Sequence, residues 1–187
     1  MAKGDTKSVK EAVKLLKEAV SYPENLGEGR LEGTRDNHVY YHLGLAYEIL
    51  GDDKKARENY EKATLGAMEV AGMMYYYDQP ADMILYQGRA FEKLGDVKEA
   101  NSRFYKLLDY GQQHLDDKFK MDYFAVSMPD MSVFDADMDL KNKAHCYYLM
   151  GLGSLGIGDK DKAKEYFGKV LIMENTHQNA GIYLKEC

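Results

Sequence analysis

Two histidines are the first residues whose spacing could serve metal chemistry. His38 and His42 lie four residues apart, which places their rings one turn apart on a helix face. Two ligands do not make a competent zinc site, and the sequence contains no HExxH or similar ligand pair. We therefore expect these rings to pack in a groove or on the surface of a helix.

Three alternating carboxylates, Asp135, Asp137 and Asp139, resemble the start of a calcium-binding loop. Such a loop requires a glycine at the next position and a glutamate at its twelfth position, where this sequence has Leu140 and Cys146. We expect no bound metal and no cofactor. The carboxylates are interpreted as an acidic turn that caps the helix after it.

The sequence also lacks the motifs of the common catalytic sites. It contains no Ser/His/Asp nucleophile signature, no phosphate-binding loop and no dinucleotide fingerprint. We therefore expect that the chain is not an enzyme. Its net charge of −6 opposes binding to phosphate backbones, so we expect no nucleic acid among its partners.

Composition indicates a folded helical protein. Of the 187 residues, 45% are hydrophobic, which is enough for one well-buried domain. Only three prolines interrupt the chain, and Asn-Gly or Asp-Gly hairpin signals are missing, so helices are favoured throughout. The two cysteines, Cys146 and Cys187, do not suggest a disulfide framework, and no apolar stretch approaches 18 residues. We expect a cytoplasmic protein that does not enter membranes.

Three segments of the chain, beginning at Tyr40, Ile84 and Tyr147, share one layout. Each contains a small residue, a Gly-Asp turn seven residues later, and then an alanine and an aromatic residue four positions apart. The small residues are Gly44, Gly88 and Gly151; the turns are Gly51-Asp52, Gly95-Asp96 and Gly158-Asp159; the pairs are Ala56 with Tyr60, Ala100 with Phe104 and Ala163 with Phe167.

Each of these positions has a physical reason. The small residue lets two antiparallel helices touch, the turn glycine adopts a left-handed conformation that ends the first helix, and the aspartate caps the second. The aromatic residue is expected to fill the space between neighbouring repeats. The pattern resembles the tetratricopeptide repeat (TPR), which implies an all-α fold, a right-handed α-solenoid of about three helix pairs plus flanking helices and one long insertion.

The expected organisation is a single TPR-like domain over residues 1–187. It comprises a helix at 8–22, repeats at 37–70, 81–114 and 144–175, an insertion at 115–143 and a terminal helix at 176–187. The first helix has no partner before it and the last has none after it. We therefore expect a fragment or the C-terminal region of a larger protein, and we expect any homodimer to form through the exposed end helices.

The insertion carries four residues that we expect to form a contact. The turn glycines are 44 and 63 residues apart, whereas a standard repeat has about 34 residues. The longer gap contains Tyr123, Phe124, Met128 and Phe134, which would give adaptable contact area at an interface. The alternative is that they plug the groove or cover the edges of repeats.

The resemblance to TPR domains also implies which side chains line the concave groove. They are His38, Tyr41, Leu45, Glu48 and Ile49 in the first repeat, Asp82, Leu85, Arg89, Glu92 and Lys93 in the second, and His145, Tyr148, Leu152, Leu155 and Gly156 in the third. The Lys and Asn clamp of chaperone-binding TPR domains is missing, so a partner held by its terminal carboxylate is disfavoured.

Two longer strings, YPENLGEGRLEGTRDNHVYYHLG and DYFAVSMPDMSVFDADMDLKNKAHCYYLMGLGSLGIGD, resemble the C-terminal TPR region of large bacterial proteins with an N-terminal β-rich domain of unknown function. This resemblance implies a module for protein–protein interaction or an intramolecular scaffold, whose partner is another protein or its own upstream domain. The alternative is an accessory lobe of a carbohydrate-active enzyme, with a sugar site formed by insertion residues such as Tyr123, Asp130 or Asp135.

Overall fold

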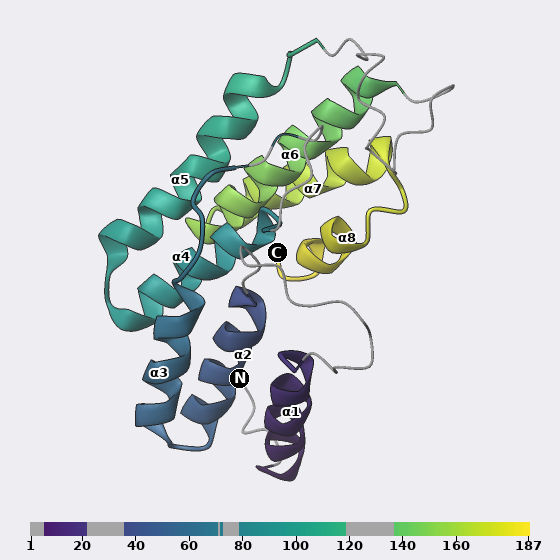
Figure 1. Cartoon of the computed structure of the whole chain (residues 1–187). Coiled ribbons are helices and arrows are strands. Elements are labelled where there is room, and N and C mark those ends of the chain that lie inside the picture. The colour runs from purple at the N-terminus through teal and green to yellow at the C-terminus, as the bar shows by residue number, and fades with distance from the viewer. Residues whose placement is uncertain (1–5, 22–35, 71, 73–78, 119–136) are drawn as a thin grey trace. The chain divides into compact units, whose positions relative to one another are not determined.

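Every regular element in the described part of the chain is an α-helix, which confirms the all-α prediction. The computed structural model describes residues 6–21, 36–70, 72, 79–118 and 137–187. Its helices are α1 (Thr6–Ala19), α2 (Asn37–Ile49), α3 (Asp53–Ala63), α4 (Asp82–Leu94), α5 (Val97–His114), α6 (Met138–Gly156), α7 (Lys160–Met173) and α8 (Gln178–Leu184) (Figure 1). Within the described residues, no helix has the length and apolar character needed to span a bilayer.

The helices are distributed over two compact units. Unit 1 contains α1 to α4 and the start of α5 as far as Ala100, and unit 2 contains α5 from Asn101 onward together with α6, α7 and α8. Within unit 1, α2 and α3 form an antiparallel pair, and α1 lies along α2. Within unit 2, α6 pairs with α7, and α8 packs against α7. The single domain expected from the sequence stays a prediction.

The three Gly-Asp turns have the geometry that the sequence predicts. Gly51, Gly95 and Gly158 have φ angles of 76°, 86° and 82°, which only glycine adopts without strain. In the first turn, the amide of Asp52 donates to the carbonyl of Tyr47 at 2.9 Å, and the other two turns repeat this hydrogen bond. This is the Schellman arrangement, in which the last carbonyls of the helix find donors.

The aspartate of each turn then begins the next helix. The Oδ1 atoms of Asp52, Asp96 and Asp159 each accept a backbone N–H three residues later, at 3.1 Å in all three turns. Asp137 does the same for α6, where its Oδ1 accepts the amide of Leu140 at 3.0 Å. The expected acidic cap is therefore confirmed at Asp137. It also starts α6 at Met138, so the last residues of the expected insertion at 115–143 are helical.

The small residue and the aromatic residue of a repeat lie against each other. A Cβ added to Gly44 would come 2.3 Å from a ring carbon of Tyr60, and one added to Gly151 would come 2.5 Å from a ring carbon of Phe167. We expected the aromatic side chains to lie between neighbouring repeats. The contacts of Tyr60 and Phe167 join the two helices of one repeat instead, whereas the ring of Phe104 in the second repeat lies against Gly156 of the third, as expected. The ring needs the space that a glycine leaves, because a real Cβ never comes so close to another heavy atom.

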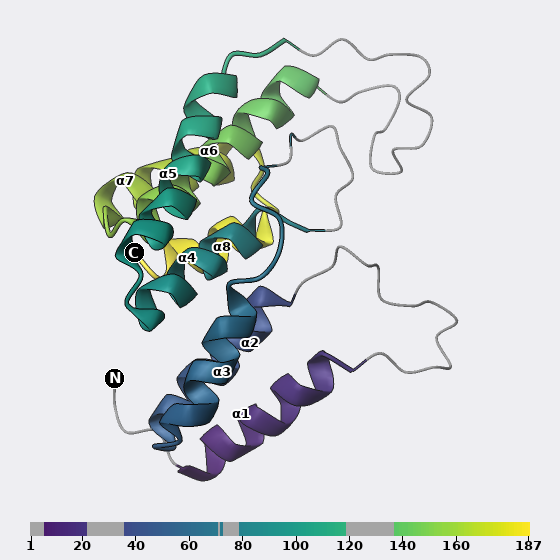
Figure 2. The same cartoon turned by 60° about the vertical axis from the view of Figure 1, so that its left-hand side comes forward.

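Glycines also bring α5 and α6 together inside unit 2. A Cβ on Gly111 of α5 would come 2.6 Å from the carbonyl oxygen of Cys146, and a Cβ on Gly153 of α6 would come 2.7 Å from that of Phe104. Figures 1 and 2 both show these two helices side by side. Here the contact is between backbones. We expected such a contact at Gly44 and Gly151, which instead lie against rings, and it occurs at two glycines that were not predicted.

Three buried amides hold the segment that leaves α3 in unit 1. Asn37 donates to two carbonyls of the segment 63–67, at 2.7 and 2.6 Å, and Gln87 donates to two at 3.3 and 3.1 Å. Gln79 accepts from the amide of Ala67 at 3.0 Å and donates to its carbonyl at 2.6 Å. These bonds satisfy backbone groups at the end of α3 and just beyond it that have no partner within the helix.

We predict opposite effects from two Gly-to-Ala substitutions in unit 2. Gly151→Ala forces a methyl group into the completely buried ring of Phe167, so we expect a loss of about 1–3 kcal/mol in unfolding free energy. Gly168→Ala lies inside α7 with nothing within 4 Å of its new Cβ, so we expect a gain of about 0.5–1 kcal/mol. Urea unfolding followed by circular dichroism measures both values. Equal effects of the two substitutions would show that the ring does not need the glycine.

Candidate functional site

Four rings gather on the faces of α2 and α4 in unit 1. His38, Tyr41 and His42 share one face of α2 because they occupy positions i, i+3 and i+4. The ring of Tyr86, from α4, lies 6.0, 5.7 and 5.5 Å from these three rings, measured between centroids. We call these four residues the aromatic cluster.

An ion pair continues this surface toward the C-terminal ends of the two helices. Nζ of Lys93 donates to both carboxylate oxygens of Glu48, at 2.8 and 3.1 Å. The hydroxyl of Tyr60, from α3, donates to the same carboxylate at 2.5 Å, and its ring lies 6.0 Å from that of Tyr41. The Glu48–Lys93 pair is thus joined to the aromatic cluster through two tyrosines.

Hydrogen bonding and burial shift the titration of this surface. The hydrogen bond from Lys93, followed by that from Tyr60, holds the pKa of Glu48 below its usual value. Burial, reinforced by the bond to Glu48, raises the pKa of Tyr60. Burial also lowers the pKa of His38, so its ring is neutral at pH 7, and its Nδ1 lies 3.3 Å from Sδ of Met83. These shifts favour an ionised Glu48 and neutral Tyr60 and His38.

Arg89 and Glu92 complete the surface on α4. The guanidinium carbon of Arg89 lies 5.7 Å from the centroid of Tyr86, within the range of a cation–π interaction. Burial raises the pKa of Glu92, and the charge of Arg89 opposes this shift. Together with the aromatic cluster, these side chains offer ring faces and two signs of charge within two adjacent helices.

The ten groove residues predicted for the first two repeats all lie on α2 or α4. Eight of them retain exposed surface, while Asp82 and Leu85 are buried. Glu48 and Glu92 are exposed, while His38, Tyr41, Leu45 and Arg89 are half-buried. Leu45 also packs against the core of unit 1. Tyr86, which contacts three members of this set, was not predicted. Only the packing of α2 beside α4 shows that its ring reaches the cluster.

The groove residues predicted for the third repeat lie differently. Leu152 is completely buried and Tyr148 nearly so, while His145 is half-buried. The ring of Tyr148 lies 4.5 Å from that of His177 and 6.3 Å from that of Tyr183, both in the α8 region. In unit 2, Tyr148 and Leu152 therefore contribute to the packing of the helices. Their role in binding stays a prediction, and their burial does not support it.

Several predicted sites lie outside the described residues. These are the insertion contact (Tyr123, Phe124, Met128 and Phe134) and the residues of the sugar alternative (Tyr123, Asp130 and Asp135). The end helices expected to mediate a homodimer are described, and each exposes an apolar residue, Leu15 on α1 and Ile182 on α8. The insertion contact, the sugar site and the dimer all stay predictions.

Metal ligands do not converge in the part of the chain that the structure describes, where no group of three or more His, Cys, Asp or Glu side chains could hold an ion. His38 and His42 pack against Tyr86, as expected for rings on a helix surface. Nδ1 of His42 lies 2.7 Å from the carbonyl oxygen of His38. Cys146 is buried, and burial raises the pKa of its thiol to about 11, so it is not a reactive thiolate at neutral pH.

Comparison with protein-family models identifies the repeats. Residues 38–65 and 144–177 match one model described as tetratricopeptide repeat, and residues 82–110 match a second model with the same description. The three ranges contain the three Gly-Asp turns. The chain therefore carries tetratricopeptide repeats, which are in general protein–protein interaction modules. The matches cover the repeats alone, so the resemblance to larger bacterial proteins stays a prediction.

We predict that the pKa of Glu48 depends on its two hydrogen-bond donors. Lys93→Met should raise this pKa toward the usual value of 4.5, and Tyr60→Phe should raise it by less. Side-chain carboxyl NMR across a pH titration measures the shift, with Lys54→Met on α3 as the control. Because the pKa is lowered by folding, the contact stabilises the protein at neutral pH, and this contribution is lost as the pH falls through the folded-state value.

The size of this contribution should be small. The side chains of Lys93 and Glu48 are 34% and 47% exposed, so we expect well under about 1 kcal/mol of stability from the pair. An unchanged Glu48 pKa in Lys93→Met would contradict the contact.

Proposed function

We propose that this chain, which carries tetratricopeptide repeats, is a protein-interaction or intramolecular scaffold module that binds through the aromatic cluster of unit 1. The bound group is a peptide segment of another protein or of the chain's own upstream domain. The observation that carries the proposal is the convergence of His38, Tyr41, His42 and Tyr86 on adjacent faces of α2 and α4.

The composition of the surface supports this proposal. Tyrosine and arginine are enriched at the centres of protein interfaces, because they offer large contact area together with a polar end. Tyr41, Tyr86 and Arg89 are each half-buried, so part of every side chain remains available to a partner. Rings that already contact one another lose little conformational freedom when a ligand binds.

The fixed charges of the site support a peptide rather than an ionic ligand. The charge of Lys93 is matched by Glu48 at 2.8 Å, and Arg89 lies beside Tyr86 and interacts with Glu92. A partner therefore gains mainly from contact with the rings, and the surrounding charges set its orientation. A catalytic role is not part of the proposal.

The alternative of a carbohydrate-active lobe has no described residue in its favour. Its named side chains, Tyr123, Asp130 and Asp135, lie outside the described residues. It remains testable, because a sugar-binding protein gives a saturable signal on a glycan array and an isolated interaction module does not.

We predict that peptides selected on the full chain will depend on the aromatic cluster. Displayed random peptides are selected against the purified chain, and their affinities are then measured by calorimetry. Tyr86→Ala or Arg89→Ala should weaken binding by about thirtyfold, as expected for residues at the centre of an interface. Arg57→Ala, on the exposed face of α3 where the side chain pairs only with Glu61 in the described part of the chain, is the matched control.

Two results would contradict the proposal. One is equal weakening by Arg57→Ala and Arg89→Ala, which would mean that the peptides do not bind at the cluster. The other is saturable binding to a glycan that competes with the selected peptides.

A further inference from the structure

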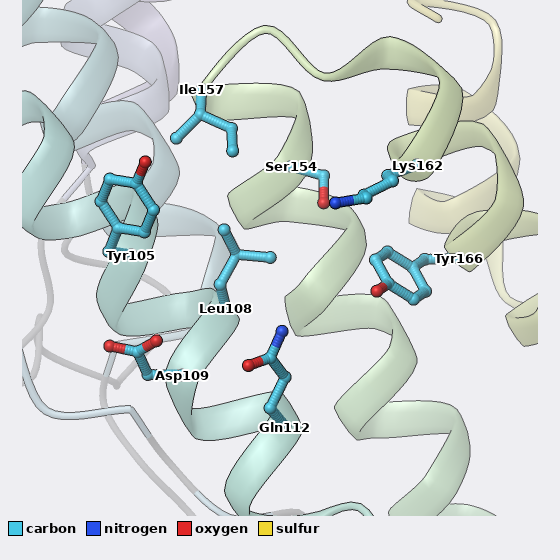
Figure 3. A pocket seen from close by; sticks show the side chains of 8 residues that line it. All are labelled: Tyr105, Leu108, Asp109, Gln112, Ser154, Ile157, Lys162 and Tyr166. Carbon is cyan, nitrogen blue, oxygen red and sulfur yellow. The ribbon is translucent and has the colours of Figure 1, made fainter.

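Unit 2 contains a pocket of about 320 Å³ between α5 and α7, over the end of α6 (Figure 3). In Figure 3, Tyr105 and Asp109 of α5 lie on one side and Lys162 and Tyr166 of α7 on the other, with Leu108 and Ser154 between them. Its volume is at the lower end of the range for small-ligand pockets, about 300–1,000 Å³. None of its residues belongs to the aromatic cluster.

The pocket follows from a run of small residues at the end of α6. In the sequence GLGSLG at 151–156, Gly151 lies against Phe167 of α7, while Gly153 and Gly156 lie against Phe104 of α5. One short stretch of α6 therefore packs against α5 on one side and against α7 on the other. Ser154 lies within the same stretch, and its side chain is too short to fill the space between α5 and α7.

The hydroxyl of Ser154 is the strongest sign that the pocket binds something. Ser154 is completely buried, and its Oγ has no hydrogen-bond partner among the described residues. A buried hydroxyl left without a bond destabilises the fold, so such groups are rare unless they serve a purpose. A ligand that reaches Oγ would remove this cost.

The rim of the pocket offers apolar surface and free polar groups. Tyr105 is 52% exposed and Ile157 is 37% exposed, which is high for large hydrophobic side chains. Asp109 and Gln112 are also exposed, and neither side chain makes a hydrogen bond with any residue that the structure describes. The amide of Gln112 can donate and accept at once, which matches the two polar groups of a peptide unit.

The charges of the pocket favour an uncharged ligand group. Its lining has one carboxylate, Asp109, and one ammonium, Lys162, and the latter already lies 3.6 Å from Asp159. A charged ligand group would be attracted by one of these two side chains and repelled by the other. A peptide group with an apolar side chain carries no net charge and avoids this repulsion.

We propose that this pocket binds an apolar side chain of a partner protein together with its adjacent peptide group. The side chain packs against Tyr105, Leu108 and Ile157, and the peptide group forms hydrogen bonds with Gln112 and Ser154. This second peptide site does not rest on the aromatic cluster, so either site can fail without the other.

The test uses N-acetyl-leucine methylamide as the probe and the full chain labelled with ¹⁵N. At about 0.3 kcal/mol for each of its roughly 13 non-hydrogen atoms, the probe should bind with a dissociation constant of about 1 mM. We expect saturable NMR shifts confined to the backbone signals of 105–112 and 153–166. Gln112→Ala should weaken binding about tenfold, whereas Gln113→Ala, its exposed neighbour outside the pocket, should not.

A second ligand separates hydrogen bonding from packing. The methyl ester of N-acetyl-leucine lacks one N–H, so it should bind about tenfold more weakly than the amide. If that N–H donates to Gln112, the Gln112→Ala variant should no longer distinguish the amide from the ester. A full tenfold difference between the two ligands in this variant would overturn the assigned hydrogen bond.

Ser154→Ala gives an independent readout. Without ligand, loss of the unbonded hydroxyl should leave the midpoint of thermal unfolding unchanged or raise it, because no internal bond is lost. With the probe, the same variant should bind several-fold more weakly. The proposal is overturned if no shift saturates by about 50 mM, which is far above the expected dissociation constant, or if Gln113→Ala weakens binding as much as Gln112→Ala.

Discussion

The contact between a ring and a glycine is the constraint on which the described structure depends. Tyr60 lies so close to Gly44 that a Cβ at position 44 would come 2.3 Å from its ring. This fixes α3 against α2, and Glu48 lies one turn after Gly44 on the same helix face. The hydroxyl of Tyr60 therefore reaches the carboxylate of Glu48. One packing contact inside the first repeat thus positions a polar group of the proposed binding surface.

Much of this fold could be predicted because its signals are local in sequence. A glycine that must adopt a positive φ and an aspartate that must cap the next helix stand side by side in all three turns, so their effect needs no knowledge of distant residues. Gly111 and Gln87 were not predicted to matter. Their roles, against the carbonyl of Cys146 and the segment 63–67, arise only when distant helices and segments meet.

The groove was predictable in part, for a related reason. Repeat alignment indicates which face of a helix a residue occupies, and in unit 1 that was enough to find His38, Tyr41 and Glu48 at a surface. Alignment does not indicate what covers that face. In unit 2 the rings of His177 and Tyr183 lie beside Tyr148, so an equivalent position is buried. Tyr86 was missed because its contacts come from the packing of α4 beside α2.

The two proposed sites differ in what each gains from a ligand. In the aromatic cluster, Glu48 and Lys93 already satisfy each other, so a partner contributes mainly by covering ring surface. In the pocket of unit 2, Ser154 has no partner in the described structure and Leu108 and Ile157 provide only a short apolar wall, so a ligand contributes by completing hydrogen bonds. A site that binds by covering rings accepts many peptide sequences. An unbonded hydroxyl favours a ligand that places one polar group correctly. The cluster should therefore supply most of the affinity for a protein partner, and the pocket should supply more of the discrimination between partners.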